Sequence, residues 1–288
     1  MAKRNAIILA AGTSTRFVPL SEETPKALLN VKGEVLIERQ IRQLREAGVD
    51  DITVVTGYKA EMFEYLEKDF GVRLVFNEDY ARYNNTSSLI RVIDRLDNTF
   101  VCSSDNYFPD NVFLNTPDNG FYSSMYSEMP SGEYFLATDE EDRIMDVRVG
   151  GSKGWYMVGH VYFDSAFSKA FSRLLSDEYS KEETRLEYWE DIYRKYISVL
   201  PPLFIKRYCQ DEIREFDTLD ELRDFDPGYI DDTRSPIIRS IAEKLGCREG
   251  ELSGFLRESP KDAPLEFSFL KDGSRLLYRF ADDSISIR

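Results

Sequence analysis

The chain has 288 residues, a length that suits one large domain or a medium domain with a small one. Its composition, 42% apolar and 31% charged, is that of a globular protein, and its longest apolar run, Ala6–Ala11, is too short to span a membrane. A charge of −15 and three scattered cysteines argue against nucleic-acid or membrane partners and a disulfide framework, so we expect a cytoplasmic protein without a signal peptide.

Strands and helices are predicted to alternate over the first hundred residues. An apolar run predicts a buried strand at Asn5–Ala10, and helical spacing of apolar residues predicts a helix over 34–47. The alternation continues through strands at 51–56, 72–76 and 99–103 and helices at 61–70 and 87–96. This order predicts a Rossmann-like α/β fold with a mixed, mostly parallel central sheet.

Beyond Asp105 the rhythm changes to short, partly antiparallel strands. We expect strands at 122–127, 134–138, 144–149 and 155–163, helices at 165–175 and 181–196, an apolar run at 203–208 and a helix at 218–225. Asp226-Pro227-Gly228 then breaks the chain. We therefore predict a main domain at 1–228 and a small C-terminal α+β extension at 229–288, with a helix at 237–245 and a hairpin of strands 265–270 and 276–280.

The loop after the first strand has the composition of a phosphate-binding segment. Its small residues, Leu9-Ala10-Ala11-Gly12, let backbone N–H groups approach a phosphate chain. Arg16 and Lys26 add two positive charges to the same segment, although neither a GxGxxG motif nor a P-loop is present. The alternative is an ordinary turn that carries two solvated cations.

The order of these pieces resembles a known family. LAAGTSTRF followed by PKALL resembles the signature of the nucleotidyltransferases that activate sugar phosphates and polyol phosphates. GYKAEMFEYL, VRLVFNEDYARYNNTSSL and SSDNYF narrow the resemblance to the phosphocholine cytidylyltransferases and their relatives that act on 2-aminoethylphosphonate. The resemblance spans about residues 3–226. It implies Mg²⁺-dependent transfer of a cytidylyl group from CTP to a phosphorylated amino alcohol, with release of pyrophosphate.

The resemblance also implies roles for the nucleotide-binding residues. Arg16 is expected to bind the outgoing β- and γ-phosphates, and Lys26 the charge that grows on the α-phosphate. The remaining nucleotide contacts are expected from Leu9, Ala10, Ala11, Gly12, Asn84, Asn85, Ser87 and Ser104. For Asn84-Asn85, a turn that caps the following helix is a compatible alternative.

Asp105 is the expected metal ligand, because it follows the fourth strand at the edge where α/β sheets bind ligands. Mg²⁺ usually takes one or two carboxylates plus phosphates, so a second acid is expected. The resemblance favours Glu190 for that role, with Asp191 as the rival after a one-residue slip, and the family's usual earlier acid is replaced by Ser103. The alternatives are a turn cap at Asp105 and a solvated acidic helix face at 190–191.

The acceptor is expected among aromatic and acidic side chains. Tyr134, Tyr188 and Trp189 fall where the resemblance places an aromatic box, and Glu215 and Asp217 where it places carboxylates for the same cation. A quaternary ammonium donates no hydrogen bond, so ring faces are its natural partners. Tyr134 stands where a tryptophan is expected, and ordinary core packing is the alternative for each ring.

Several choices remain open from the sequence. The acceptor could instead be 2-aminoethylphosphonate, phosphoethanolamine or, with UTP or dTTP, a sugar 1-phosphate, and a non-catalytic nucleotide-binding regulator is the alternative of another class. The only histidine, His160, lies in an apolar strand and is expected in the core. Residues 229–288 resemble the opening of choline-kinase-like domains but have no kinase catalytic loop, so we expect no kinase activity and consider a homodimer formed through this extension.

Overall fold

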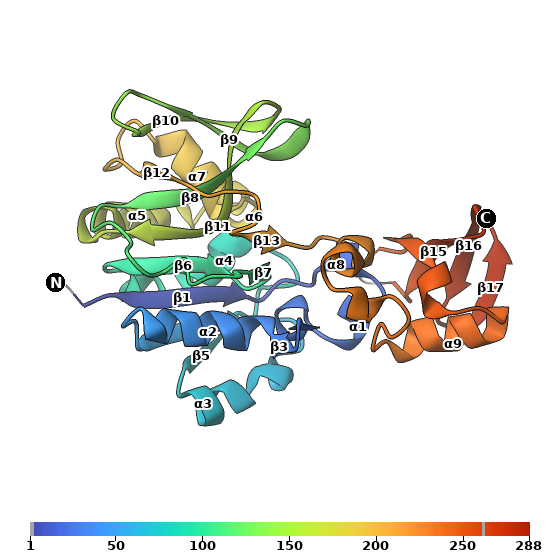
Figure 1. Ribbon diagram of the computed structural model, residues 1–288. Helices are drawn as coiled ribbons and strands as arrows, with labels where there is room; N and C mark the ends of the chain where they lie inside the picture. Colours follow the sequence, from blue (N-terminus) through green and yellow to red (C-terminus); the bar gives the residue numbers. More distant parts are fainter. Residues whose placement is uncertain (1–2, 261–262) are drawn as a thin grey trace. The chain divides into compact units, whose positions relative to one another are not determined.

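The computed structural model describes residues 3–260 and 263–288, which pack as two compact units (Figure 1). Unit 1 consists of the residues up to Gly12 and of Ile37–Glu215. Unit 2 combines Thr13–Leu36 with Phe216–Arg288. The segment that carries Arg16 and Lys26 therefore packs with the C-terminal part of the chain. Residues 216–228 belong to unit 2, together with the residues that follow them. The domain boundary expected after residue 228 stays a prediction.

Unit 1 is built on a nine-stranded sheet with the order β10-β9-β11-β6-β1-β4-β5, in which β8 pairs with β11 and β12. The strands are β1 Asn5–Ala10, β4 Asp51–Thr56, β5 Arg73–Phe76, β6 Thr99–Ser103, β8 Phe121–Ser127, β9 Ser131–Thr138, β10 Ile144–Gly151, β11 Gly154–Phe163 and β12 Phe204–Arg207. β1 runs parallel to β4 and β6, and β11 runs antiparallel to β6. The predicted mixed, mostly parallel α/β sheet is confirmed.

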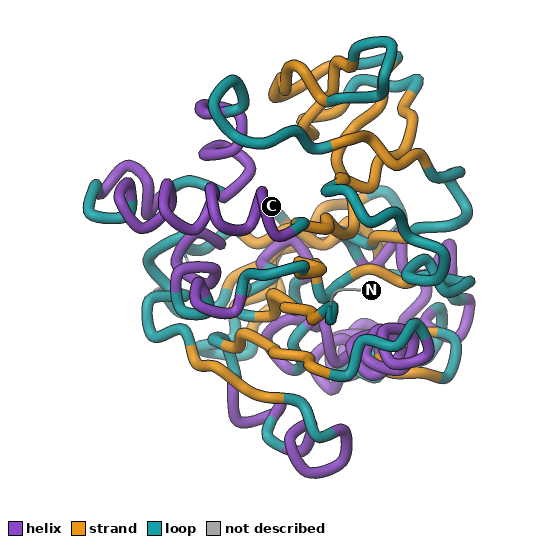
Figure 2. The backbone as a smooth tube through the Cα atoms, turned by 90° about the vertical axis from the view of Figure 1, so that its left-hand side faces the viewer, coloured by secondary structure: helices purple, strands orange, loops and turns teal. Residues whose placement is uncertain are grey.

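Helices cover the sheet of unit 1, and Figure 2 shows them on both sides of the strands. They are α2 Leu36–Glu46, α3 Tyr65–Phe70, α4 Asn85–Ile90, α5 Ser165–Glu178, α6 Glu182–Leu186 and α7 Trp189–Tyr196. Buried aromatic side chains of α5, α7 and β11 fill the space between helices and strands, among them Phe163, Phe167, Phe171 and Trp189. A short pair, β7 Asn106–Tyr107 and β13 Arg214–Glu215, completes the unit.

Three predicted helices are divided. Those expected at 61–70 and 87–96 each consist of a short α-helix, α3 or α4, and a separate 3₁₀ turn, Ala60–Phe63 or Ile93–Arg95. The expected helix over 181–196 is wrong, because the chain is extended at Glu187 and Tyr188 and divides into α6 and α7. The hydroxyl of Thr86 on α4 lies within hydrogen-bond distance of the carbonyls of Thr184, Arg185 and Glu187. The single hydroxyl proton can reach one of these carbonyls at a time, and the Asn84 N–H donates to that of Arg185. Because these donors come from a distant segment, the break cannot be read from local periodicity.

Unit 2 contains a four-stranded antiparallel sheet with the order β14-β15-β16-β17. Its elements are α1 Leu20–Glu23, β2 Asn30–Val31, β3 Glu34–Val35, α8 Leu219–Phe225, α9 Pro236–Leu245, β14 Ser253–Arg257, β15 Glu266–Lys271, β16 Ser274–Arg279 and β17 Ser284–Ile287. The predicted helix and hairpin of the extension are present, joined by two further strands. Over the ranges that the structure describes, none of the helices combines the length and the apolar character that a bilayer crossing needs.

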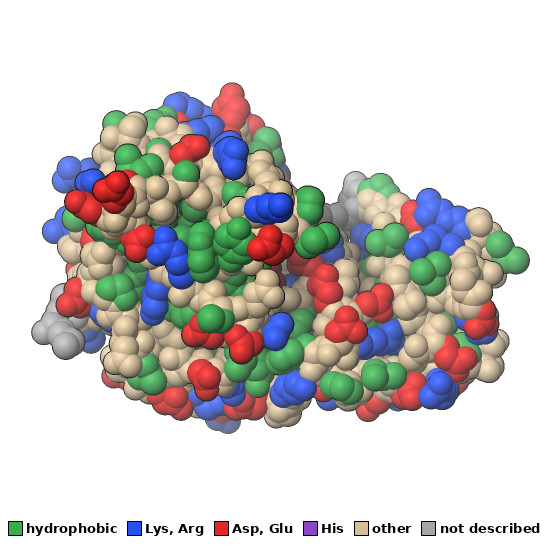
Figure 3. Space-filling model, turned by 45° about the horizontal axis from the view of Figure 1, so that its top comes forward, with side chains coloured by type: hydrophobic (Ala, Val, Ile, Leu, Met, Phe, Trp, Pro, Cys, Tyr) green, Lys and Arg blue, Asp and Glu red, His purple; other side chains and the backbone are tan. Residues whose placement is uncertain are grey.

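Acidic and basic side chains are interspersed over the face of the molecule in Figure 3. This mixture is consistent with a chain in which 52 acidic residues outnumber 37 basic ones.

Candidate active site

Unit 2 brings together the two cations that the sequence singles out. Arg16 lies in a 3₁₀ turn, Thr15–Phe17, and its Nη1 is 2.6 Å from Oδ2 of Asp217. The Nζ of Lys26 is 3.6 Å from Oδ1 of the same carboxylate. The Lys26 side chain is only 5% exposed, whereas that of Arg16 is 71% exposed. Arg16 and Lys26 thus both lie against the carboxylate of Asp217, and two cations so close together suit a phosphate group.

The position of Asp217 differs from the role that the resemblance implies. Asp217 was expected to face the cation of the acceptor, and it is instead the partner of Arg16 and Lys26. Its backbone N–H donates to Oε2 of Glu221, whose own N–H donates to the hydroxyl oxygen of Thr218, the N-cap residue of α8. Asp217 is therefore fixed by the beginning of a capped helix.

In unit 1 the carboxyl end of β1 carries the expected nucleotide-binding backbone. Ala10 and Ala11 are each 6% exposed, and the Ala11 carbonyl accepts a hydrogen bond of 3.1 Å from the N–H of Tyr58. A side chain on Gly12 would meet nothing within 4 Å, but a Cβ on Gly57 would lie 2.6 Å from that of Tyr80 and 2.9 Å from that of Ala11. Gly57, the first residue of the GYKAEMFEYL segment, is thus the glycine that the packing of this loop requires.

Asn84, Asn85 and Ser87 lie at the start of α4 and are held by protein partners. The Asn84 amide donates to the carbonyl of Leu186, and Asn84 is the N-cap residue of α4, although its side chain makes no capping bond. Oδ1 of Asn85 accepts from the N–H of Trp189 at 2.7 Å. Ser87 is fully buried, with Oγ 2.7 Å from the Asn84 carbonyl. Asn84 and Asn85 thus fasten α4 to Leu186 and to the first residue of α7, whereas the Ser87 hydroxyl bonds at the start of its own helix.

Glu190 points into a polar pocket of the unit 1 core. Its carboxylate accepts from the Asn85 amide at 3.2 Å and from the Tyr122 hydroxyl at 3.1 Å. Burial raises the pKa of Glu190 to about 7, while these hydrogen bonds act to lower it. The ring of Tyr122 stacks on Trp189 at a centroid distance of 5.6 Å.

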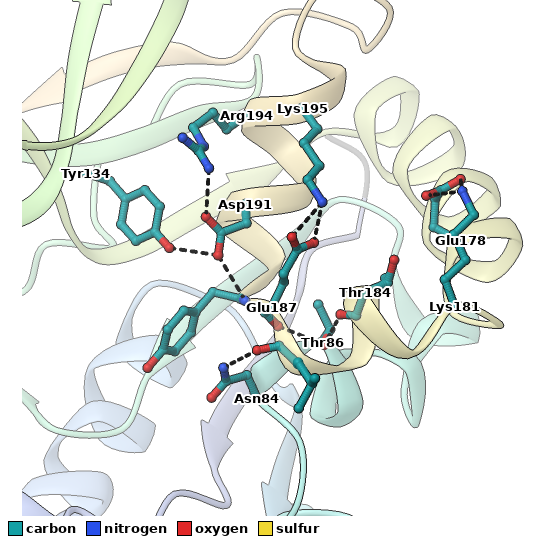
Figure 4. Close-up of polar contacts among 12 residues, drawn as sticks. Asn84, Thr86, Tyr134, Glu178, Lys181, Thr184, Glu187, Asp191, Arg194 and Lys195 are labelled. Carbon is teal, nitrogen blue, oxygen red and sulfur yellow. Dashed lines mark hydrogen bonds and ion pairs between the residues drawn. The ribbon is translucent and has the colours of Figure 1, made fainter.

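Asp191 faces a different neighbour from Glu190. Its Oδ2 accepts from the Tyr134 hydroxyl at 3.0 Å and from the Tyr188 N–H at 3.2 Å, as Figure 4 shows for Tyr134. Its Oδ1 is 3.5 Å from Nη2 of Arg194. The two consecutive acids of α7 therefore have separate sets of partners.

The three predicted ring residues differ in their exposure and surroundings. Tyr134 is partly buried, and Tyr188 is 48% exposed. Trp189 is 2% exposed and packs edge-on against Phe163 and Phe171 in the core. Asp191 connects Tyr134 with the backbone of Tyr188, whereas Trp189 has the surroundings of a core residue.

Ser104 and Asp105 form the turn between β6 and β7. The amide of Gln40 donates to the Ser103 carbonyl at 3.0 Å and fixes the end of β6. Glu215 lies opposite Asn106 in the β7–β13 pair, and Asn106 directly follows Asp105 in the chain. Within the described parts of the chain, no group of three or more His, Cys, Asp or Glu side chains could hold a metal ion. An ion at Asp105 would take further ligands such as water or phosphate oxygens.

His160 is a core residue, as predicted. It is 1% exposed and surrounded by aromatic rings, including those of Phe113 at 5.1 Å and Phe108 at 5.7 Å. Burial lowers its pKa to about 3, with a smaller contribution from Lys206. A neutral, enclosed imidazole has no access to a substrate.

Comparison with known proteins identifies the family. Residues 6–124 match the MobA-like NTP transferase domain. The choline-phosphate cytidylyltransferase of Streptococcus pneumoniae is 36% identical over 218 residues, which are 76% of this chain and 95% of that protein. The 2-aminoethylphosphonate cytidylyltransferase of Lancefieldella rimae is 36% identical over 232 residues, 79% of this chain and 94% of that protein.

A solved structure agrees with these relatives. The structure of the CTP:phosphocholine cytidylyltransferase from Streptococcus pneumoniae is similar with a TM-score of 0.74 at 36% identity. The similarity covers 77% of this chain and 97% of that one. The chain is thus an enzyme of the nucleotidyltransferase family that includes the choline-phosphate and 2-aminoethylphosphonate cytidylyltransferases.

Proposed function

We propose that this enzyme transfers the cytidylyl group of CTP to phosphocholine, forming CDP-choline and pyrophosphate. The observation that carries the proposal is the pairing of Arg16 and Lys26 around one carboxylate, in a chain similar over most of its length to a choline-phosphate cytidylyltransferase. Such a pair provides fixed positive charge for a triphosphate, which is what nucleotidyl transfer requires.

The reaction proposed is an in-line displacement at the α-phosphorus. An oxygen of the acceptor phosphate forms the new P–O bond, and the bond to the β-phosphate breaks as pyrophosphate leaves. Lys26 stabilises the charge that grows on the α-phosphate, and Arg16 stabilises the leaving pyrophosphate. The acceptor phosphate is already ionised at neutral pH, so positioning and electrostatics suffice without a general base. This agrees with a single histidine that is buried away from solvent.

We further propose that Mg²⁺ is bound by Asp105 and by phosphate oxygens of the nucleotide. A partly exposed carboxylate at the end of β6 fits an ion that takes one or two carboxylates plus phosphates. Once bound, the ion would neutralise charge on the reacting phosphates. Glu190 as second ligand stays a prediction, and its two hydrogen bonds and raised pKa make the set of Asp105 plus phosphates the better fit.

For the acceptor, we propose that the rings of Tyr134 and Tyr188 contact the quaternary ammonium group. Glu215 is proposed to supply a carboxylate to the same cation. Burial raises the pKa of the nearby Tyr122 and Tyr156, and the negative charge of Glu215 raises it further. The second candidate acceptor is 2-aminoethylphosphonate, which the name of the Lancefieldella rimae relative specifies for that protein. A cytoplasmic location, where free CTP is available and the three thiols stay reduced, is part of the proposal.

A pyrophosphate-release screen tests the proposal. CTP and UTP are each combined with phosphocholine, phosphoethanolamine, 2-aminoethylphosphonate and glucose 1-phosphate. We expect the highest kcat/KM for CTP with phosphocholine. A preference for UTP with glucose 1-phosphate would contradict the proposal, and release from no pair would favour a non-catalytic regulator.

A further inference from the structure

We propose that Asp191 is a positioning residue for the acceptor, because its hydrogen bond to Tyr134 joins the β9–β10 hairpin to the start of α7. This inference rests on the proposed function, in which the rings of Tyr134 and Tyr188 contact the cation of the acceptor. Asp191 itself would touch no substrate. It would set where the two rings stand.

The contacts of Asp191 join two elements that are far apart in the sequence. Oδ2 of Asp191 accepts from the hydroxyl of Tyr134 on β9 at 3.0 Å and from the N–H of Tyr188 at 3.2 Å (Figure 4). The Asp191 side chain is only 15% exposed, so solvent screens these bonds weakly. One carboxylate therefore fixes both the hydroxyl end of one ring and the backbone that carries the other.

The sheet connects β9 to β11 at one position beside Tyr134, and the hairpin residues Phe135, Ile144 and Val147 are buried. β9 and β10 pair along their whole length, but β9 meets β11 at a single register pair, Phe135 with Tyr156. The other end of the hairpin is tied to β12 by the Ile144 N–H and the Asp142 carbonyl. Close to Tyr134, the Tyr134–Asp191 bond is thus an additional connection between the hairpin and the body of unit 1.

The same bond favours the chemistry of a cation site. Burial and the charge of Asp191 raise the pKa of Tyr134 above its ordinary value, so the phenol stays protonated and keeps donating. A phenol that donates to a carboxylate has a more electron-rich ring than a free phenol. Because cation–π attraction depends on the negative ring face, this polarisation strengthens contact with an ammonium group.

Glu190, one residue earlier, does not share this role, because a different tyrosine donates to its carboxylate. The hydroxyl that donates to Glu190 is that of Tyr122, which is buried and stacked on the core residue Trp189. Glu190 therefore fastens α7 to the core, and Asp191 fastens it to the hairpin.

The test compares Tyr134→Phe and Asp191→Ala, neither of which can form the Tyr134–Asp191 bond, in the full chain with Glu187→Gln as control. Glu187 lies two residues before α7, and the control variant weakens its ion pair with Lys195 (Figure 4). We expect both test variants to raise KM for phosphocholine by at least about fivefold, with KM for CTP and kcat changed by less than about twofold. The double variant should be no worse than the worse single one, because both remove the same bond.

Hydrogen exchange of the β9–β10 amides provides a readout that needs no turnover. We expect faster exchange in this hairpin for both test variants and wild-type exchange for Glu187→Gln. Unchanged exchange, additive effects in the double variant, or an equal rise in KM for CTP would overturn the proposal. If the wild type transferred cytidylyl to no acceptor, the proposed function would fail, and the exchange data would still decide whether Asp191 holds the hairpin.

Discussion

The carboxylate of Asp217 lies 2.6 Å from the Arg16 guanidinium and 3.6 Å from the Lys26 ammonium, so one acid compensates both cations of the proposed reaction. The two ion pairs differ in how strongly solvent weakens them. The Arg16 side chain is largely exposed, and exposed pairs contribute only about 0–1 kcal/mol, whereas Lys26 is buried and depends on its partner. We therefore expect Arg16 to exchange Asp217 for a phosphate when CTP binds, while Lys26 keeps its position.

Lys26→Met should lower kcat by at least about 100-fold, or about 2.7 kcal/mol, because a charge that stabilises the transition state is removed. Methionine keeps the apolar volume of the buried stem. Lys32→Met is the control, since Lys32 lies over the Phe225 ring in the same unit and has no proposed role in the reaction. Near-normal turnover of Lys26→Met, measured by pyrophosphate release, would remove Lys26 from the mechanism.

Asp217→Asn should tighten binding of inorganic triphosphate in the presence of a chelator by several-fold. The variant removes the negative charge of Asp217 beside Arg16 and Lys26, and with it the repulsion between that carboxylate and the triphosphate. Calorimetric titration of the metal-free protein measures the effect, with Asp224→Asn on α8 as the control for charge alone. Weaker or equal binding would show that Asp217 does not compete with phosphate for these cations.

Asp105→Asn should shift the concentration of Mg²⁺ needed for half-maximal turnover upward by at least about tenfold, and a chelator should stop turnover of the wild type. Glu190→Gln keeps the size of the side chain and can still accept from Tyr122, so we expect its Mg²⁺ dependence to stay near that of the wild type. An equal shift in both variants would make Glu190 the second metal ligand, as the sequence predicts.

His160 gives the chain a defined acid sensitivity. Its pKa is about 3 in the folded protein and near 6.5 when unfolded, so the unfolded state binds the proton more readily. The stability that the neutral ring provides is complete above pH 6.5 and is lost as the pH falls toward 3, at up to about 1.4 kcal/mol per pH unit.

His160→Leu should remove this part of the pH dependence. Urea unfolding between pH 7 and pH 4.5 should give a smaller decline in the free energy of unfolding for the variant than for the wild type. As the only histidine, His160 also gives a single pair of imidazole NMR signals, which should not titrate down to pH 4.5. A midpoint near 6.5 in the folded protein would contradict its burial.

The sequence predicts those features that depend on local pattern. Asn5–Ala10 is apolar from Ala6 onward and ends at small residues, and the structure has β1 at the same bounds. Features that depend on distant partners escape this reasoning. Thr86 interrupts the helix expected at 181–196, and Trp189 lies in the core because α5 and β11 supply Phe171 and Phe163 to surround it.

In the candidate site, too, the contacts between distant residues could not be predicted from local sequence pattern. The pattern identifies Arg16 and Lys26 as cations of one loop, and the structure brings them together. That their partner is Asp217, two hundred residues later, follows from the folding of Thr13–Leu36 with the C-terminal part of the chain, which no local signal reveals. The division of labour between Glu190 and Asp191 likewise depends on which tyrosine each one meets.

The most direct test of the central claim is a ³¹P NMR time course of the full chain with CTP, phosphocholine and Mg²⁺. We predict that the phosphocholine signal is lost in step with the triphosphate signals, while the diphosphate signals of CDP-choline and the signal of pyrophosphate appear in equal amounts. Hydrolysis of CTP without loss of phosphocholine, or an unchanged spectrum, would contradict the proposed reaction.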